Sequence, residues 1–127
     1  MLIRALEIRM SDGTMDPAYD EFEMAYVYCE DAESGYCVSL SRCRPDRHIE
    51  VMVRDQKCLK SNQVEVELTP TRLRILLSAS LAKKLEGIAE YEVQLKLRRK
   101  QLRDLDRSLA VIFQRCKPGQ YRCCLQE

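Results

Sequence analysis

The chain lacks tryptophan, carries a single histidine, and has only four glycines among its 127 residues. Because these glycines are not clustered, the sequence has none of the glycine-rich loops that cradle phosphate groups. His48 follows a charged turn, where a solvent-facing role is simpler than a role in serine or cysteine catalysis. The sequence therefore argues against most enzyme classes, and we predict no catalytic residue and no cofactor.

Long hydrophobic runs are also missing. No stretch approaches the roughly 18 apolar residues that cross a bilayer, and the N-terminus lacks the basic and apolar regions of a signal peptide. We therefore expect a cytoplasmic protein without a membrane segment. Apolar residues make up 46% of the chain and charged residues 32%, which is typical of a globular domain. We expect one domain over residues 1–117 and a flexible tail over residues 118–127.

Cysteine is present, but in an odd count of seven. Without a secretion signal, this count argues against a disulfide framework. No two cysteines have C-x-x-C spacing, so no compact pair of zinc ligands exists and we predict no metal site. Cys29, Cys37 and Cys116 are expected in the core as small hydrophobic residues. Cys123 and Cys124 are expected to be exposed thiols in the tail.

Most of the chain alternates between apolar and polar residues, which is typical of strands. Segment 22–29 carries bulky residues on both faces, so we expect it to be central in the sheet. Glu65 and Glu67 alternate outward on one strand and Arg72 and Arg74 on the next, which predicts cross-strand ion pairs. The predicted strands are 2–9, 22–29, 36–41, 49–54, 64–68, 72–77 and 91–97.

The periodicity changes near the C-terminus. Apolar residues there recur every three or four positions, which predicts a helix from Gln101 to Arg115. A shorter helix over residues 81–85 is expected after Ser78 or Ser80, either of which can cap it. Strands followed by one long helix indicate an α+β fold. We predict a mainly antiparallel sheet of six to seven strands, covered by the C-terminal helix, with one short additional helix.

Charge is strongly segregated beneath a net charge of +1. Residues 11–33 hold eight acidic residues and no lysine or arginine, whereas residues 98–122 hold eight basic residues and two acidic ones. Opposed fields of this kind steer partners. The acidic loops could cover the basic cleft of a nucleic-acid-cutting enzyme by imitating phosphates, or the basic helix could itself contact phosphates. Both patches could also be solvated surface or meet within the fold. The residues predicted to bind a partner are Glu30, Asp31, Glu33, Asp20 and Glu21.

Several segments carry a resemblance to a known family. They are Tyr36–Arg42, His48–Gln56, Val66–Leu68, Leu73–Leu77 with Leu81, Leu85 and Gly87, and the closing Leu105, Leu109 and Ile112-Phe113. Together they resemble immunity family ten, a group of bacterial immunity proteins from polymorphic toxin systems. The resemblance implies a cytoplasmic, non-catalytic protein that binds and neutralises one cognate toxin. It implies no particular binding residues.

The sequence thus predicts an immunity protein that binds a cognate toxin, as a monomer or a homodimer, since exposed edge strands permit pairing. The alternative is a nucleic-acid-binding module that uses Arg98, Arg99, Arg103 and Arg107. A third hypothesis, a small enzyme, requires a deep pocket that holds a titratable group with a strongly shifted pKa.

Overall fold

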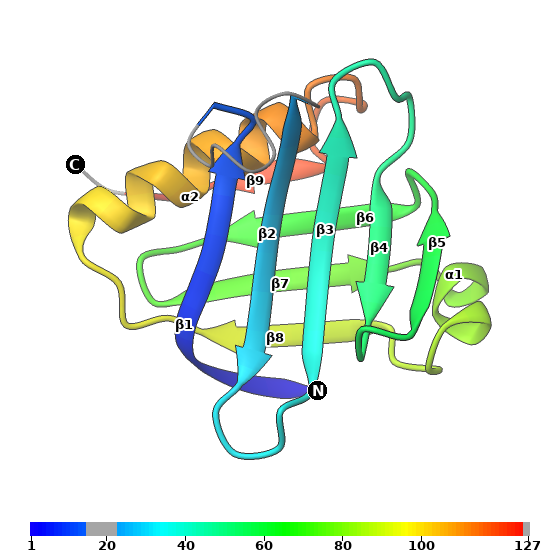
Figure 1. Ribbon diagram of the computed structural model, residues 1–127, viewed down its shortest axis with the longest axis horizontal. Coiled ribbons are helices and arrows are strands. Elements are labelled where there is room, and N and C mark those ends of the chain that lie inside the picture. Colours follow the sequence, from blue (N-terminus) through cyan, green and yellow to red (C-terminus); the bar gives the residue numbers. More distant parts are fainter. Residues whose placement is uncertain (15–22, 126–127) are drawn as a thin grey trace.

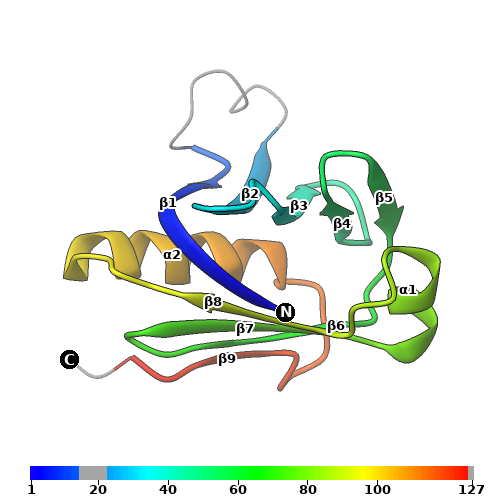
Figure 2. The same cartoon turned by 90° about the horizontal axis from the view of Figure 1, so that it is seen from below.

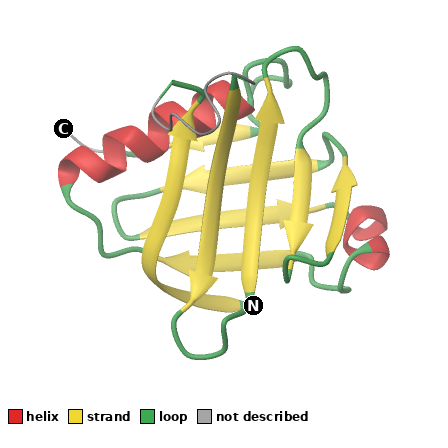
Figure 3. Cartoon of the chain, viewed as in Figure 1, coloured by secondary structure: helices red, strands yellow, loops and turns green. Residues whose placement is uncertain are grey.

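The computed structural model describes residues 1–14 and 23–125, with only the backbone described at Leu6 and Glu7. It is an α+β fold in which strands dominate (Figures 1 and 3). The elements are β1 (Leu2–Asp12), β2 (Met24–Asp31), β3 (Cys37–Cys43), β4 (Glu50–Val53), β5 (Lys57–Lys60), β6 (Val64–Leu68), β7 (Arg72–Leu77), α1 (Ala79–Lys84), β8 (Glu90–Gln94), α2 (Arg99–Ile112) and β9 (Tyr121–Cys123).

The described strands form one mixed sheet in the order β5-β4-β3-β2-β1-β8-β7-β6-β9. Strand β1 links its two parts. Its first residues pair in parallel with β8, and its register then shifts between Ala5 and Ile8 before it pairs with β2. A shift of this kind bends a strand. The sheet therefore folds into two half-sheets, the first with β2–β5 and the second with β6–β9, whose strands cross in Figure 1.

Alternation places one face of each half-sheet in a shared core. In β2 the buried residues are Ala25, Val27 and Cys29, and in β6 they are Val64, Val66 and Leu68. Burying each large apolar side chain contributes roughly 1.5–3 kcal/mol before conformational entropy is subtracted. The core therefore lies between the half-sheets, and their other faces point outward.

Helix α2 lies between the two half-sheets at one open side of the core (Figure 2). Leu105, Leu109 and Ile112 are fully buried on one helical face, and the helix contacts β1, β2, β3 and β9. The sequence predicted a helix that covers one face of the sheet. The structure differs because the sheet bends, so α2 packs between its halves.

Arg42 of β3 holds the C-terminal end of α2. Its side chain is only 3% exposed, and its guanidinium donates to the carbonyls of Ile112 at 2.8 Å and Val111 at 2.5 Å. It also donates to the carbonyls of Arg44 and Asp46. The last carbonyls of a helix have no partner within the helix, so Arg42 supplies both hydrogen bonds and charge that favours this end of the helix dipole.

The strand count and the strand pairing correct the sequence analysis. The sheet has nine strands in the described part of the chain, not six to seven. Residues 57–60, predicted as a connection, form β5 opposite β4. Residues 121–123, predicted as tail, form β9 beside β6. Six of the eight strand pairs are antiparallel, but β1–β8 and β6–β9 are parallel.

Other expectations are confirmed. Strand β2 is internal to the sheet, between β1 and β3. Helix α1 is capped by the Ser78 hydroxyl, which accepts from the Leu81 N–H at 3.1 Å. Helix α2 begins at Arg99 and ends at Ile112, close to the predicted limits. None of the helices in the described residues has the length and apolar character that spanning a membrane requires.

Candidate functional site

The outward face of the second half-sheet is covered by paired charges. Glu67 of β6 lies 3.5 Å from Arg72, 3.9 Å from Arg74 and 3.5 Å from Arg122. The same β7 arginines reach β8, where Arg72 lies 3.2 Å from Glu92 and Arg74 pairs closely with Glu90. We call this set the charge ladder, made of Glu67, Arg72, Arg74, Glu90, Glu92 and Arg122.

The charge ladder confirms part of the predicted cross-strand pairing. Glu67 lies opposite Arg74 in the β6–β7 register, whereas Glu65 lies opposite Leu76 and pairs with neither arginine. Side chains of this kind are partly exposed, and each exposed pair contributes about 0–1 kcal/mol. Because the opposite charges neutralise one another within the chain, this face has little net field to attract a partner.

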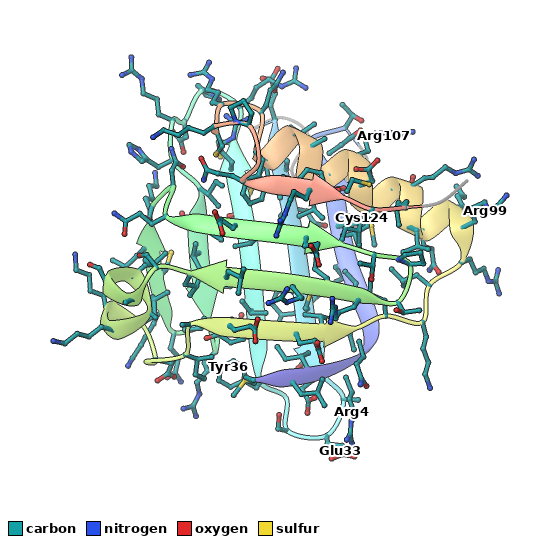
Figure 4. All side chains as sticks on the ribbon, turned by 180° about the vertical axis from the view of Figure 1, so that it is seen from behind. Arg4, Glu33, Tyr36, Arg99, Arg107 and Cys124 are labelled. Carbon is teal, nitrogen blue, oxygen red and sulfur yellow. The ribbon has the colours of Figure 1, made fainter. Side chains whose placement is uncertain are left out.

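The outward face of the first half-sheet is different in chemistry. This face turns toward the viewer in Figure 1, whereas the outward face of the second half-sheet turns toward the viewer in Figure 4. The side chains on the outward face of the first half-sheet surround a hollow of about 340 Å³. We call this set the tyrosine face, made of Arg9, Met24, Tyr26, Tyr28, Ser39, Ser41, Glu50 and Met52.

Strand register explains the hollow. In one row across the half-sheet, Tyr28 lies opposite Ser39, which lies opposite Met52. In the next row, Tyr26 lies opposite Ser41, which lies opposite Glu50. The two serines are short and each is 8% exposed, so they form a floor. Longer side chains of β2 and β4 stand on either side of it. We call this groove along β3 the serine channel.

Tyr28 is held in place from both ends. The guanidinium carbon of Arg9 lies 4.5 Å from the centre of its ring, a cation–π contact. Its hydroxyl donates to Asp55 Oδ2 at 3.1 Å. The pKa of Tyr28 is raised, first by the hydrogen bond with the Cys37 thiol and then by burial. The ring is therefore a fixed, neutral wall of the serine channel.

The β4–β5 turn places Asp55 below this wall. Arg54 and Asp55 both have left-handed backbone conformations, with φ of 58° and 55°. Aspartate tolerates this region better than most residues, but arginine rarely adopts it. Arg54 is stabilised there by Glu86, whose Oε1 lies 3.4 Å away. Glu86 also lies 3.5 Å from Lys57 Nζ, so one carboxylate joins both ends of the turn to the loop after α1.

The predicted acidic patch is divided by the structure. Glu30 is exposed and continues the outward row of β2 beyond Tyr28. Asp31 instead builds the hairpin, where its carboxylate accepts from the N–H groups of Arg4 and Ser34, each at 2.9 Å. Glu33 Oε1 lies 3.6 Å from Arg4 Nη1, and Figure 4 shows the two residues near each other at one edge of the molecule. The two remaining predicted contacts, Asp20 and Glu21, lie outside the described residues.

The basic residues of the alternative site gather at the start of α2. Arg99, Lys100 and Arg103 are exposed, and none of them forms an ion pair with another described residue. Figure 4 shows Arg99 at the far end of the molecule. Arg107 lies one or two turns further on, 4.0 Å from Asp12. The first turn of α2 contains no acidic residue to balance these cations. Positive charge at the start of a helix is unfavourable because it opposes the helix dipole.

Two cysteine thiols among the described residues have strongly raised pKa values. Burial raises the pKa of the Cys29 thiol to about 12, and burial together with Glu50 raises that of Cys58 to about 11. Thiols with such pKa values stay protonated and are weak nucleophiles near neutral pH. His48 is exposed, as expected. Within residues 1–14 and 23–125, no group of three or more histidine, cysteine or acidic residues could hold a metal ion.

The other cysteine predictions are confirmed at four of five positions. Cys29 and Cys37 are buried and Cys123 and Cys124 are exposed, whereas Cys116 is only half-buried.

No protein-family model, curated protein or solved structure matches this chain. The sequence predicted that segment 22–29 carries bulky residues on both faces of a central strand, but it did not predict the serine channel. That site needs the register of three strands, which alternation within one strand does not give.

Proposed function

We propose that the protein is a non-catalytic immunity protein that binds and neutralises a cognate toxin protein through the tyrosine face. One observation carries the proposal. The two outward faces of the sheet differ: one is covered by self-paired charge, and the other presents tyrosine and methionine around a hollow. Tyrosine, methionine and arginine are enriched in the centres of protein interfaces, whereas acidic residues and lysine are depleted there.

The shape of the tyrosine face supports a protein partner. Tyr28 is fixed by Arg9 and Asp55 before any partner arrives, so little side-chain entropy is lost on binding. A preformed hollow on an otherwise broad sheet face receives one anchoring side chain, and such anchors dominate binding energy. The raised pKa values of the Cys29 and Cys58 thiols agree with a role in binding, since neither thiol is an activated nucleophile.

The proposed function predicts that an adjacent upstream reading frame encodes a toxin, and the test measures binding between the full chain and the toxin domain of that product. Isothermal titration calorimetry gives the affinity, and growth of bacteria that express the toxin domain gives neutralisation. Met52→Lys puts a charge on the wall of the hollow, and we expect it to weaken binding at least about tenfold, as at other interface centres. The proposal is overturned if the purified toxin domain does not bind the wild-type chain.

A matched variant on the opposite face provides the control. Leu76 is also a half-buried apolar residue on an outward sheet face, and it lies opposite Glu65 and Glu90 in the register. Leu76→Lys makes the same chemical change next to carboxylates that accommodate it. We expect toxin affinity within about twofold of wild type, because surface changes outside an interface are near neutral. Equal losses in both variants would contradict the choice of face.

The acidic border of the tyrosine face gives a second measurement. Glu30→Lys reverses a charge at the end of the β2 row, and Glu33→Lys reverses one that is already paired with Arg4. Rim charges affect association rate and salt dependence more than affinity. We expect Glu30→Lys to slow association and reduce its salt dependence, and Glu33→Lys to do so less.

The basic start of α2 favours a second candidate function, nucleic-acid binding. The observation is that Arg99, Lys100 and Arg103 stand without ion pairs to described residues at a helix end where cations are unfavourable. Phosphate binding is strongest at low salt. An electrophoretic shift of single- or double-stranded DNA or RNA at low ionic strength, lost in the triple variant with Arg99, Lys100 and Arg103 changed to Gln, would support it. Absence of any shift would exclude it.

A further inference from the structure

We infer that the serine channel binds one arginine side chain of the partner protein and that Glu50 is the carboxylate that selects it. The inference rests on the proposed function, because it names the chemistry of the group that enters the tyrosine face. In this arrangement, the aliphatic stem of the arginine lies over Ser39 and its guanidinium lies over Ser41.

The dimensions of the channel fit a long, unbranched side chain. Neighbouring strands lie about 4.8 Å apart, so residues on β2 and β4 face each other across about 10 Å, with β3 between them. Over Ser39 the walls are Tyr28 and Met52, which are apolar and suit methylene groups. Over Ser41 the walls are Tyr26 and Glu50. One end of the channel is therefore apolar, and the other carries a ring, a hydroxyl and a carboxylate.

Charge around Glu50 leaves its carboxylate available to a cation. Lys60 lies opposite Glu50 in the register, but its Nζ turns to Asp46 Oδ2 at 3.4 Å. The Cys58 thiol is hydrogen-bonded to Glu50, which contributes to the raised pKa of that thiol. A thiol is a weak donor, and a guanidinium replaces it with a stronger, charge-assisted hydrogen bond. Glu50 is also half-buried, where water screens a charge less than at a fully exposed site.

Arginine fits this end better than lysine or an apolar group. Its planar guanidinium donates in a fork to a carboxylate, whereas an ammonium is a point charge, and Glu50 is the carboxylate at this end of the channel. The one cation in the set, Arg9, belongs to β1 and stacks on Tyr28. Arg9 and Tyr28 belong to the row of Ser39. The Arg9 guanidinium therefore lies beside the stem of the entering arginine, and the entering guanidinium lies over Ser41 in the next row.

The test uses small probes and does not depend on the toxin. Nα-acetyl-arginine N-methylamide is titrated into the 15N-labelled full chain, and backbone amide shifts are followed. The matched probe is Nα-acetyl-citrulline N-methylamide, which has a similar shape and no charge. We expect saturable shifts at Ser39, Ser41 and Glu50 with the arginine probe, and at least about tenfold weaker binding of the citrulline probe, because a hydrogen bond to a charged group is lost.

Three variants sharpen this test. Glu50→Gln keeps the size of the side chain and should weaken the arginine probe about tenfold while leaving the citrulline probe unchanged. Ser41→Val fills the floor of the channel and should weaken both probes. Arg9→Gln should leave the affinity for arginine unchanged or slightly tighter. Equal binding of the two probes, no saturable shift with arginine, or no effect of Glu50→Gln would each overturn the inference.

The two proposals fail separately. If Glu50→Gln leaves toxin affinity unchanged while Met52→Lys abolishes binding, the arginine inference is wrong and the docking face is retained. If the toxin domain does not bind the wild-type chain but the arginine probe does, the proposed function is wrong and the channel remains an arginine-binding site.

Discussion

The two outward faces of this sheet are built on similar backbones and carry opposite chemistry. On the second half-sheet, each strand of the charge ladder places acids opposite bases, so that Glu67 alone is shared by three arginines. On the first half-sheet, long side chains of β2 and β4 flank two serines. A face whose charges are paired with one another is suited to water. A face with apolar side chains around a hollow exposes apolar surface, which a bound partner would cover.

Burial alone would not separate these faces, because both contain half-buried residues. The useful distinction is whether the polar groups of a face are already paired within the chain. Ladder charges have partners at 3.2–3.9 Å apart from the closer Arg74–Glu90 pair. In the serine channel, Glu50 forms no ion pair with another described residue, and the Cys58 thiol, a weak donor, is hydrogen-bonded to its carboxylate. This difference between Glu50 and the charge ladder is the reason we propose the tyrosine face as the docking face.

The largest expected effect comes from disrupting the core that both half-sheets share. Leu109 is fully buried on α2 between the half-sheets. Leu109→Asp would bury a carboxylate without a partner, and we expect a loss comparable with the whole stability of a domain, roughly 5–15 kcal/mol, so that the variant unfolds. Circular dichroism during urea unfolding measures it. The matched variant is Ala110→Asp at the exposed neighbouring position, which should stay folded. A folded Leu109→Asp variant would contradict the packing of α2 between the half-sheets.

The second test asks whether the first half-sheet can be destabilised without affecting the second. Arg42→Met removes the donors from the carbonyls of Val111 and Ile112, and buried acceptors without donors cost about 1–3 kcal/mol each. We expect a loss of at least about 2 kcal/mol in the free energy of unfolding. Hydrogen exchange should rise in β3 and the last turn of α2 more than in β6 and β7. Arg44→Met is the control, because the Arg44 side chain is exposed and lies at a long 3.9 Å from its ion-pair partner Glu23. Uniform exchange throughout the chain would show that Arg42 does not act locally.

Sequence reasoning reached the parts of this fold that are local. Alternation identified β2, β3, β6 and β7, and the three- to four-residue period identified α2. It missed β5 because Lys57–Lys60 is short and has lysines at both ends. It missed β9 because the strand that these three residues pair with, β6, lies more than fifty residues earlier in the chain.

The candidate sites follow the same rule. The acidic patch was read from composition, yet Asp31 turned out to build a hairpin with Arg4, which is 27 residues away. Arg42 bonds to carbonyls 69 and 70 residues away, and no local pattern marks it. The serine channel depends on the register of β2, β3 and β4. Short serines in a strand look like ordinary polar alternation until their neighbours on both sides are known.

The third test compares the loss of a charge on the charge ladder with an uncharged substitution on the tyrosine face. Glu67→Gln removes the carboxylate that Arg72, Arg74 and Arg122 share, so the three positive charges repel one another. We expect the free energy of unfolding to fall by about 1 kcal/mol, and by less in high salt. Met52→Gln on the tyrosine face should change stability by less than about 0.5 kcal/mol at any salt concentration. Urea unfolding at low and high salt distinguishes them. A salt-independent effect of Glu67→Gln would mean that the charge ladder is not an electrostatic unit.

The smallest expected effect concerns Asp31, at the hairpin that borders the tyrosine face. Hydrogen bonds from the N–H of Arg4 and from Ser34 lower the pKa of this carboxyl to about 2, below its ordinary value of 3.8. Because the folded pKa lies below the unfolded one, the carboxylate stabilises the fold above about pH 4, and this contribution is lost as the pH falls toward 2. Asp31→Asn should therefore lower stability slightly at neutral pH and flatten the pH dependence of unfolding between pH 4 and 2. If Asp31→Asn left the acid limb of the unfolding curve unchanged, the assignment of Asp31 as a structural residue of the hairpin would be wrong.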